Sequence, residues 1–408
     1  MNLSLHKNQA EIKADLQITG SKSESNRLLI LQALYPEIKI ENLSNSDDTE
    51  VLKKALEKSS GLIDIHHAGT AMRFLTAYFA CKEGCEVEIT GSKRMKERPI
   101  RLLVDALQRM GADIQYKDEV GFPPLIIKGK KLHADSVKLK ANISSQYISA
   151  LMLIGGSLPN GLEIILEGQV TSTPYILMTL EILKQAGIKG YFKDDRIYIA
   201  PVTKLEPVSI AVESDWSSAS YFYSIAAISD SAEIKLSNYR KDSRQGDSCL
   251  AEIYKHFGVQ TEYSKNSIFL SKQKMKRSVR IHEDLRNSPD IAQTIAVTCL
   301  ALGMECVLEG LHTLKIKETD RLQALKNEME KFGARVQITD DCLHLLPVKS
   351  LDKDVFIETY NDHRMAMAFA PLALKTSFSI KDAGVVSKSY PDFWKDLKEI
   401  GFETTEII

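Results

Sequence analysis

Residues 360–367 read YNDHRMAM and place a carboxylate, an imidazole and a guanidinium side by side at the start of an apolar run. The three groups belong to Asp362, His363 and Arg364. A hydrophobic core has no use for such a triplet, because buried charges are costly unless they are paired. Acid, base and anion-binding chemistry all use these side chains. The triplet therefore marks a candidate site at a helix start.

Two further segments also place cations where a helix would begin. Residues 20–27 read GSKSESNR before the run LLILQAL, and residues 317–321 read KETDR before LQALKNEMEKFG. Helix N-termini carry a partial positive charge, so Lys or Arg in the first turn opposes the helix dipole. A bound anion would offset that cost. We therefore predict an anion site served by several helix starts, with a solvated surface cation as the alternative at any single position.

Two carboxylates at these helix starts are candidates for proton transfer. Asp290 follows Pro289 and opens an almost wholly apolar helix, and Glu318 lies between Lys317 and Arg321. Asp290 could simply complement the helix dipole, and Glu318 could be a salt-bridged residue that orients its neighbours. Among many cations, the pair could also divide the roles of general base and general acid. The sequence leaves both interpretations open.

A repeating pattern indicates the elements that position these residues. Five amphipathic segments stop at a glycine and continue as a strand-like alternation, at intervals of 76, 71, 75 and 68 residues: Gly111, Gly187, Gly258, Gly333 and Gly401. A weaker sixth copy stops at Gly61. More apolar helical segments and short β-rich segments lie between them. The pattern predicts an α/β protein of six units, arranged as two domains of three.

The composition is that of an ordinary globular protein. The chain has 408 residues, 44% hydrophobic and 26% charged, which fits about two or three domains and excludes disordered and fibrous classes. Lys and Arg number 53 against 54 Asp and Glu, so the basic excess of a sequence-independent nucleic-acid binder is missing. The amino terminus has no apolar stretch of signal-peptide length, no later segment reaches the ~18 uninterrupted apolar residues of a membrane span, and we expect a cytoplasmic, monomeric protein.

Several common types of site are absent from the sequence. Six scattered cysteines are typical of a reducing compartment, and Cys81 and Cys85 lack a second pair, so we expect no metal. Residues 20–23, which read GSKS, do not complete a Walker A loop, and neither GxGxxG nor GxSxG occurs. These absences argue against a nucleotide-binding loop, a dinucleotide fold and a hydrolase of the nucleophile-elbow type.

In chain order, the motifs closely resemble the 5-enolpyruvylshikimate-3-phosphate synthase family. The matching strings are GSKSESNR, AGTAMR, RMKERPIRLLVDAL, SSQYISALM, STPYI, ESDWSSASYF, QGD, SPDIAQTIA, KETDRL, NDHRMAMAFAPLAL and SKSYPDFW, which together span essentially the whole chain. The resemblance implies two domains, each of three βαβαββ units whose helix N-termini face an interdomain cleft. We place residues 20–213 in the first domain, and residues 1–19 with 214–408 in the second.

The resemblance also implies a reaction. The family transfers the enolpyruvyl group of phosphoenolpyruvate to the 5-hydroxyl of shikimate 3-phosphate and releases phosphate through a tetrahedral ketal phosphate, without a metal or organic cofactor. The implied catalytic residues are Asp290 as proton acceptor, Glu318 as proton donor, and Lys22. The implied shikimate 3-phosphate ligands are Lys22, Ser23, Arg27, Ser144, Ser145, Gln146, Ser172, Asp290, Thr313 and Lys317. The implied phosphoenolpyruvate ligands are Lys22, Gly69, Arg94, Gln146, Arg321, Arg364 and Lys388.

Three positions depart from the family pattern. His67 and Phe74 flank AGTAMR where the family usually has Asn and Pro, and Thr313 stands where many members have Asn. Arg94 and Arg98 are both candidate anion ligands of this segment, although Arg98 precedes Pro99 and could merely pair with Glu97 or Asp105; the resemblance implies Arg94.

Two other functions remain open at this stage. A UDP-N-acetylglucosamine enolpyruvyl transferase shares fold and donor but typically uses a cysteine proton donor, and residues 94–100 contain none. A phosphate-sensing or RNA-end-binding protein could use the same repeats, but the near-zero net charge and the two carboxylates argue against pure binding.

Overall fold

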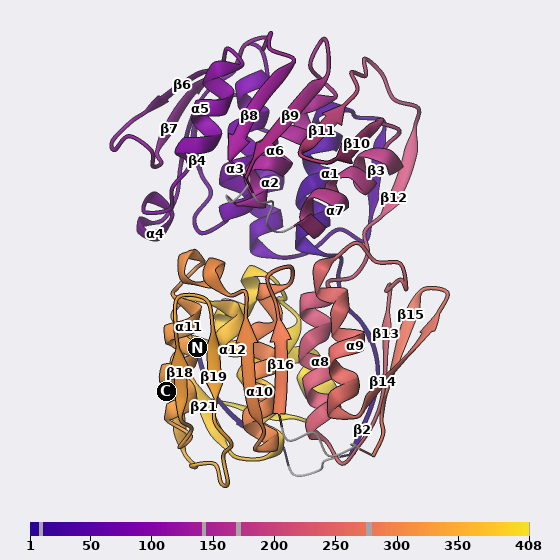
Figure 1. The fold of residues 1–408 in the computed structure, drawn as a ribbon, viewed down its shortest axis with the longest axis vertical. Coiled ribbons are helices and arrows are strands. Elements are labelled where there is room, and N and C mark those ends of the chain that lie inside the picture. Colours follow the sequence, from indigo (N-terminus) through magenta and orange to yellow (C-terminus); the bar gives the residue numbers. More distant parts are fainter. Residues whose placement is uncertain (8–10, 141–143, 169–172, 275–279, 408) are drawn as a thin grey trace. The chain divides into compact units, whose positions relative to one another are not determined.

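The structure is a computed structural model that describes residues 1–7, 11–140, 144–168, 173–274 and 280–407. Its contacts divide the chain into two compact units (Figure 1). The inserted unit is Gly20–Val212, and the terminal unit combines Met1–Thr19 with Glu213–Ile408. We propose that these units are the two domains of the protein.

The inserted unit consists of helices packed with small sheets. Its helices are α1 (Lys22–Leu34), α2 (Asp47–Leu56), α3 (Gly69–Cys81), α4 (Lys93–Lys96), α5 (Arg101–Arg109), α6 (Ser145–Gly155) and α7 (Thr173–Gln185). Its strands are β3 (Ile38–Glu41), β4 (Ser60–Asp64), β5 (Glu86–Thr90), β6 (Asp113–Tyr116), β7 (Leu125–Lys128), β8 (Ser136–Lys140), β9 (Leu162–Glu167), β10 (Gly190–Lys193), β11 (Arg196–Ile199) and β12 (Val208–Ala211). In this unit α3 and α6 pack against each other, and α7 packs on α6.

The terminal unit has the same kind of construction. Its helices are α8 (Trp216–Ile228), α9 (Leu250–Ile253), α10 (Ala292–Leu302), α11 (Arg321–Glu330), α12 (His363–Phe369) and α13 (Phe393–Glu399). Its strands are β1 (Asn2–His6), β2 (Glu11–Gln17), β13 (Ser231–Ser237), β14 (Val259–Ser264), β15 (Ser267–Lys272), β16 (Arg280–Asp284), β17 (Glu305–Glu309), β18 (Val336–Ile338), β19 (Leu343–Leu345), β20 (Val355–Ile357), β21 (Phe378–Ile380) and β22 (Glu403–Ile407). Helix α10 packs against α8 and α12.

The sheets repeat one topology. In β4-β5-β7-β6 the first pair is parallel and the next two pairs are antiparallel. Four other sheets follow the same rule: β8-β9-β11-β10, β2-β13-β15-β14, β16-β17-β19-β18 and β20-β21-β1-β22. Within the described residues, β3 and β12 form a parallel pair. A parallel pair requires a crossover, here supplied by an apolar helix such as α3 between β4 and β5. The predicted α/β repeat is therefore confirmed.

Each unit has its own hydrophobic core, and the apolar helices lie within it. Helices α3, α8 and α10 are buried along almost their entire length, as their apolar sequences predict. The predicted helix over residues 363–374 is shorter: α12 ends at Phe369 and a 3₁₀ segment, Ala370–Leu374, follows. Pro371 has no N–H group to continue the α-helical hydrogen bonds.

Of the six glycines that the repeat predicts as helix stops, Gly61 lies inside β4 (Ser60–Asp64), while α2 ends earlier at Leu56, so Gly61 does not close a helix. The other five lie just past a helix and adopt the left-handed conformation, with φ angles of 102° at Gly111, 87° at Gly187, 75° at Gly258, 84° at Gly333 and 87° at Gly401. This is the conformation in which a residue without Cβ closes a helix at low cost. Within the described ranges, no helix combines the length and hydropathy needed to cross a bilayer.

Candidate active site

In the terminal unit, one arginine joins three carboxylates. Arg321 is the first residue of α11, and its side chain is only 2% exposed. Its Nη1 donates to Asp290 Oδ1 at 2.7 Å and its Nη2 to Glu318 Oε2 at 2.8 Å. Its Nε donates to Asp362 Oδ2 at 2.6 Å. Burial lowers the pKa of Arg321, but Asp362, Glu318 and Asp290 outweigh it and raise the pKa.

Asp290 is surrounded by further cations. Its Oδ1 lies 3.4 Å from Lys317 Nζ, and its Oδ2 lies 3.3 Å from Arg364 Nη2. Burial raises the pKa of Asp290, but the charges of Arg364, Lys317 and Arg321 prevail and hold the pKa well below its usual range. Asp290 is therefore an ionised carboxylate whose oxygens can accept a proton once these cations are engaged elsewhere.

A second buried carboxylate reaches Arg364 through a serine. Arg364 Nη2 donates to Ser217 Oγ at 3.2 Å, and the Ser217 hydroxyl donates to Asp247 Oδ2. Burial and the neighbouring Asp290 charge raise the pKa of Asp247 to about 6, against the opposing effect of Arg364. Asp247 is thus a group that titrates close to neutral pH beside the candidate site.

We expect Asp247→Asn to change the pH dependence of stability. Since the folded pKa of Asp247 lies above its unfolded value, the stabilisation is fully present below about pH 4 and is lost as pH rises through about 6. A rise from 3.8 to about 6 corresponds to ~3 kcal/mol. Relative to the parent, the free energy of unfolding of the variant should therefore improve by ~3 kcal/mol between pH 4 and pH 7 in denaturant titrations. Exposed Asp242→Asn is the control, and parallel profiles for Asp247→Asn and the parent would refute the prediction.

The triplet that opened the sequence analysis has a structural role in this cluster. Asp362 caps α12, because its Oδ1 accepts the N–H of Arg364 at 2.9 Å while the same carboxylate binds Arg321. His363 is buried and its Nδ1 lies 3.8 Å from Asp362 Oδ1. Lys388 Nζ donates to the carbonyl of Asn361 at 2.7 Å, which joins Lys388 to this helix start.

In the inserted unit, Lys22 and Arg27 lie on α1. Lys22 Nζ lies 3.1 Å from Asp48 Oδ2. Arg27 is 2% exposed and its guanidinium donates to Thr179 Oγ1 at 2.8 Å, to Ser149 Oγ at 2.9 Å and to the carbonyl of Ser23 at 2.8 Å. Burial lowers the pKa of Arg27 to about 10. Arg27 is thus a buried cation held by neutral oxygen atoms.

A second pair of guanidinium groups lies at the start of α3. An ideal Cβ on Gly69 would lie 2.4 Å from Arg98 Nη1, so the Arg98 guanidinium covers this glycine. Arg73 is buried, and its Nη1 donates to the carbonyl of Gly69 at 3.1 Å. Burial and the charge of Arg98 lower the pKa of Arg73 to about 10. Two adjacent cations and a helix N-terminus are a suitable setting for an anion.

The structure brings Arg98, not Arg94, to Gly69. Arg94 lies on α4 with its side chain 42% exposed, and its Nη1 lies 3.4 Å from Glu97 Oε2. Asp105 lies 3.6 Å from Arg101. The carboxylates that could have paired with Arg98 thus pair with its neighbours, and the preference for Arg94 finds no support in this geometry.

The remaining predicted ligands lie at other helix starts. Ser144 caps α6 by accepting the N–H of Gln146 at 3.4 Å, and Ser145 is the first residue of that helix. Gln146 Nε2 donates to Thr70 Oγ1 at 3.0 Å, next to Gly69. Thr313 lies in the 3₁₀ segment His312–Ile316, and its Oγ1 is buried with no hydrogen-bond partner among the described residues. Ser172 lies outside the described residues.

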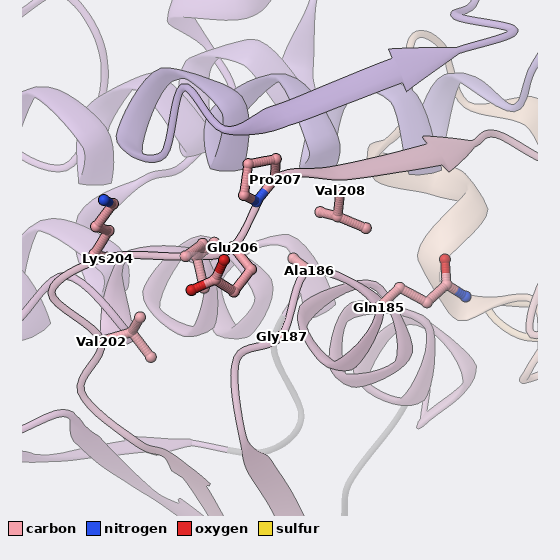
Figure 2. A pocket seen from close by; sticks show the side chains of 9 residues that line it. Gln185, Ala186, Gly187, Val202, Lys204, Glu206, Pro207 and Val208 are labelled. Atoms are coloured by element: carbon pink, nitrogen blue, oxygen red, sulfur yellow. The ribbon is translucent and has the colours of Figure 1, made fainter.

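A cavity of about 420 Å³ lies elsewhere in the inserted unit (Figure 2). It is lined by the end of α7 and by the segment that leads into β12, including Gln185, Gly187, Lys204, Glu206 and Pro207. Its two charged side chains have opposite signs, and it contains none of the predicted ligands. No group of His, Cys, Asp and Glu side chains suited to a metal ion occurs in the part of the chain that the structure describes.

Comparisons with known proteins identify the family. The profile of EPSP synthase (3-phosphoshikimate 1-carboxyvinyltransferase) matches residues 53–397. The chain belongs to the EPSP synthase family. A 3-phosphoshikimate 1-carboxyvinyltransferase of Bacteroides fragilis is 45% identical over 397 residues, covering 96% of both chains. One from Haemophilus influenzae is 36% identical over 428 residues, covering 95% of this chain and 96% of the relative.

Solved structures show the same fold. EPSP synthase from Acinetobacter baumannii superposes with a TM-score of 0.81 at 21% identity, covering 99% of this chain and all of that one. The enolpyruvyl transferase NikO from Streptomyces tendae gives a TM-score of 0.75 at 13% identity, covering 99% of this chain and 98% of that one. The two-domain enolpyruvyl transferase fold expected from the sequence is confirmed.

The structure shows what surrounds Phe74, one of the residues that depart from the EPSP synthase pattern. Phe74 is buried on α3, and its ring centroid lies 5.4 Å from Cζ of Arg27. A cation over an aromatic face at this distance is stabilised electrostatically. Phe74 therefore helps to hold the buried Arg27 guanidinium in this member of the family.

Sequence reasoning included Arg98 among the candidate anion ligands but did not place it at Gly69, and it missed Ser217 and Asp247 altogether. Ser217 and Asp247 lie 30 residues apart and touch only through tertiary packing. No local pattern links that pair to Arg364.

Proposed function

We propose that this chain transfers the enolpyruvyl group of phosphoenolpyruvate to the 5-hydroxyl of shikimate 3-phosphate, giving 5-enolpyruvylshikimate 3-phosphate and phosphate in aromatic amino-acid biosynthesis. Family membership supports the reaction. The observation that carries the site is the grouping of Asp290 and Glu318 on opposite Nη atoms of one buried arginine, Arg321. Such a grouping supplies a base, an acid and an anion ligand within one hydrogen-bonded cluster.

In the first step, the substrate 5-oxygen bonds to C2 of phosphoenolpyruvate and its methylene C3 takes up a proton, giving the tetrahedral ketal phosphate. Asp290 accepts the proton of the 5-hydroxyl, and Glu318 donates the proton to C3. In the second step, the Glu318 carboxylate takes a proton back from the new methyl group, the C2–O bond to phosphate breaks, and the proton held by Asp290 is released with the departing phosphate. The double bond reforms and phosphate departs with the bridging oxygen.

The cations of the cluster couple anion binding to both proton transfers. Arg321 forms ion pairs with both Asp290 and Glu318. A substrate anion that engages Arg321 weakens both pairs, and a neighbouring negative charge favours the protonated form of each carboxylate. The binding of phosphoenolpyruvate therefore makes Asp290 a better proton acceptor and favours the acid form of Glu318.

The charges of the substrates fit the number of proposed cations. Each substrate carries a carboxylate and a phosphate of about −1.5 to −2, so together they bring about −5 to −6. Two like charges about 4 Å apart cost roughly 4 kcal/mol at an effective dielectric constant near 20. The proposed neutralising side chains are Lys22, Arg27, Arg98, Lys317, Arg321, Arg364 and Lys388. We propose Arg98 in place of Arg94 because of its position at Gly69.

Arg98→Ala is expected to raise the KM for phosphoenolpyruvate about 10- to 100-fold, since a hydrogen bond to a charged group contributes ~1.5–3 kcal/mol. Arg94→Ala on the exposed face of α4 is the matched variant and should change that KM less than about twofold, as expected of an exposed ion pair. Steady-state kinetics with saturating shikimate 3-phosphate measure both values. The opposite order of the two effects would return the ligand role to Arg94.

We further propose that the protein acts in the cytoplasm as a monomer, with these two small substrates and no metal, nucleic acid or membrane partner. Scattered cysteines and a near-neutral charge support this assignment.

Isotope labelling tests the bond that breaks. Phosphoenolpyruvate with ¹⁸O in its bridging position should deliver the label to the released phosphate, because the reaction cleaves the C–O bond. A phosphatase that cleaves the P–O bond would leave the label in pyruvate. Mass spectrometry of phosphate after one incubation with shikimate 3-phosphate distinguishes the two, and label in pyruvate would overturn the proposal.

A further inference from the structure

The turn before α12 contains backbone strain. Tyr360 and Asn361 are consecutive non-glycine residues with φ angles of 54° and 56°. Left-handed backbone is unfavourable for residues that carry a Cβ, so it persists only where the surroundings hold it. The N–H of Asp362 donates to the carbonyl of Thr359 at 2.8 Å and closes the turn. Something else must hold Tyr360 and Asn361 in this conformation.

Two side chains on one face of helix α11 form hydrogen bonds with residues of this turn. Arg321, at its first position, binds Asp362, and Glu328 lies seven residues later, which is two helical turns. Glu328 is fully buried, and its Oε1 accepts the Tyr360 hydroxyl at 2.6 Å. Its Oε2 accepts the N–H of Glu358 at 3.0 Å and lies 2.6 Å from Lys331 Nζ.

Residues of this turn also bind three side chains that are proposed ligands of phosphoenolpyruvate. The Asn361 carbonyl, which follows a left-handed residue, accepts Lys388 Nζ at 2.7 Å. The Asp362 carboxylate binds Arg321 and also accepts the N–H of Arg364 at 2.9 Å. If Tyr360 and Asn361 left the left-handed conformation, the groups that bind Arg321, Arg364 and Lys388 would therefore move together.

We propose that Glu328 is a positioning residue: through Tyr360 and the Glu358 amide it fixes the strained turn that aligns Arg321, Arg364 and Lys388 for the anionic donor substrate. The inference rests on the proposed function, because the assignment of these three cations to phosphoenolpyruvate belongs to it. Glu328 itself is buried beneath the turn and need not touch a substrate to exert this effect.

Glu328→Gln tests the role with a side chain of nearly the same shape. The amide oxygen can still accept the hydrogen bond of the Tyr360 hydroxyl. The NH₂ group, however, faces the donors of Glu358 and Lys331, so the interactions with these two residues are lost. The KM for phosphoenolpyruvate should rise about tenfold, with the KM for shikimate 3-phosphate changed less than about twofold. Tyr360→Phe removes the contact that Glu328→Gln retains and should have a similar effect, and the double variant should lose more than either single variant, because the two changes remove different contacts to the same turn.

Hydrogen exchange provides a readout that does not depend on turnover. In Glu328→Gln, amides of residues 358–366 should exchange faster while the remaining amides keep their protection. Exposed Glu330→Gln, on the same helix, is the control for both measurements and should leave both unchanged. If Glu328→Gln does not fold, Tyr360→Phe alone carries the test.

Three outcomes are decisive. A selective rise in the KM for phosphoenolpyruvate with faster exchange limited to residues 358–366 supports the proposal. An unchanged KM in a folded variant, or an equal loss for both substrates with faster exchange throughout the protein, overturns it. If the parent protein does not use phosphoenolpyruvate at all, the proposed function fails, and the exchange data still decide whether Glu328 holds the turn.

Discussion

Replacing Glu318 by glutamine should lower turnover by about 10²- to 10⁴-fold, the usual contribution of a positioned general acid. The amide oxygen of the introduced glutamine can still accept from Arg321 Nη2, which holds Glu318 Oε2 at 2.8 Å in the parent. The substituted amide cannot supply a proton to carbon. Turnover should therefore fall with little change in either KM, because the variant retains the binding cluster and loses only a group that acts in the transition state.

This substitution separates the two roles that the sequence left open for Glu318. If the carboxylate only orients Arg321, glutamine keeps that hydrogen bond and turnover stays close to normal. Deuterium incorporation into the enolpyruvyl methylene, measured in D₂O, should fall in step with turnover if Glu318 is the donor. Exposed Glu330→Gln, two turns or more along α11, should leave both rates unchanged.

Arg321→Met should be the most destabilising single substitution in the candidate site. The change leaves Asp290, Glu318 and Asp362 without their common partner, and Asp362 is fully buried. Removing one partner of a buried ion pair typically costs about 3–5 kcal/mol, because an uncompensated charge remains in a poorly solvated place. Denaturant unfolding at pH 7.5 should show a loss of this size, and phosphate release should fall at least ~10²-fold.

The stability loss caused by Arg321→Met should depend on pH. Protonation removes the charge of a buried carboxylate that has lost its cation, so lowering the pH should reduce the cost of losing Arg321. The deficit relative to the parent should therefore shrink as pH falls from 7.5 towards 5. The exposed Arg335→Met, in the same unit, is the matched control. A loss below ~1 kcal/mol for Arg321→Met, or one that grows at low pH, would contradict the ionic account.

Local sequence patterns predicted the elements better than the contacts. The starts of α1, α11 and α12 could be predicted from the charged residues that precede apolar or amphipathic segments, and five of the six glycine stops from the repeat. Arg321 and Glu318 could be grouped because they lie only three residues apart in the chain. The choice between Arg94 and Arg98 could not be made this way, since Arg94 lies on the short helix α4 and Arg98 just after it, and only the folded chain brings one of them to Gly69.

Contacts between residues far apart in the sequence could not be predicted either, for the same reason. Asp247 reaches Arg364 through Ser217, and Asp290 meets Arg364 across 74 positions. Neither contact has a periodic signature, because each depends on how separate elements pack. The strained turn at Tyr360 and Asn361 was also invisible in the sequence, since neither residue is a glycine that would signal a positive φ angle.

The central claim is that Asp290, Glu318 and the surrounding cations carry out enolpyruvyl transfer between two specific anions. The most direct test is a coupled phosphate-release assay of the metal-free protein with shikimate 3-phosphate and phosphoenolpyruvate, each alone and together. We predict phosphate only when both are present, in equal amount to 5-enolpyruvylshikimate 3-phosphate, and none when UDP-N-acetylglucosamine replaces shikimate 3-phosphate. Phosphate release from phosphoenolpyruvate alone, or transfer to the UDP-sugar instead, would contradict the account.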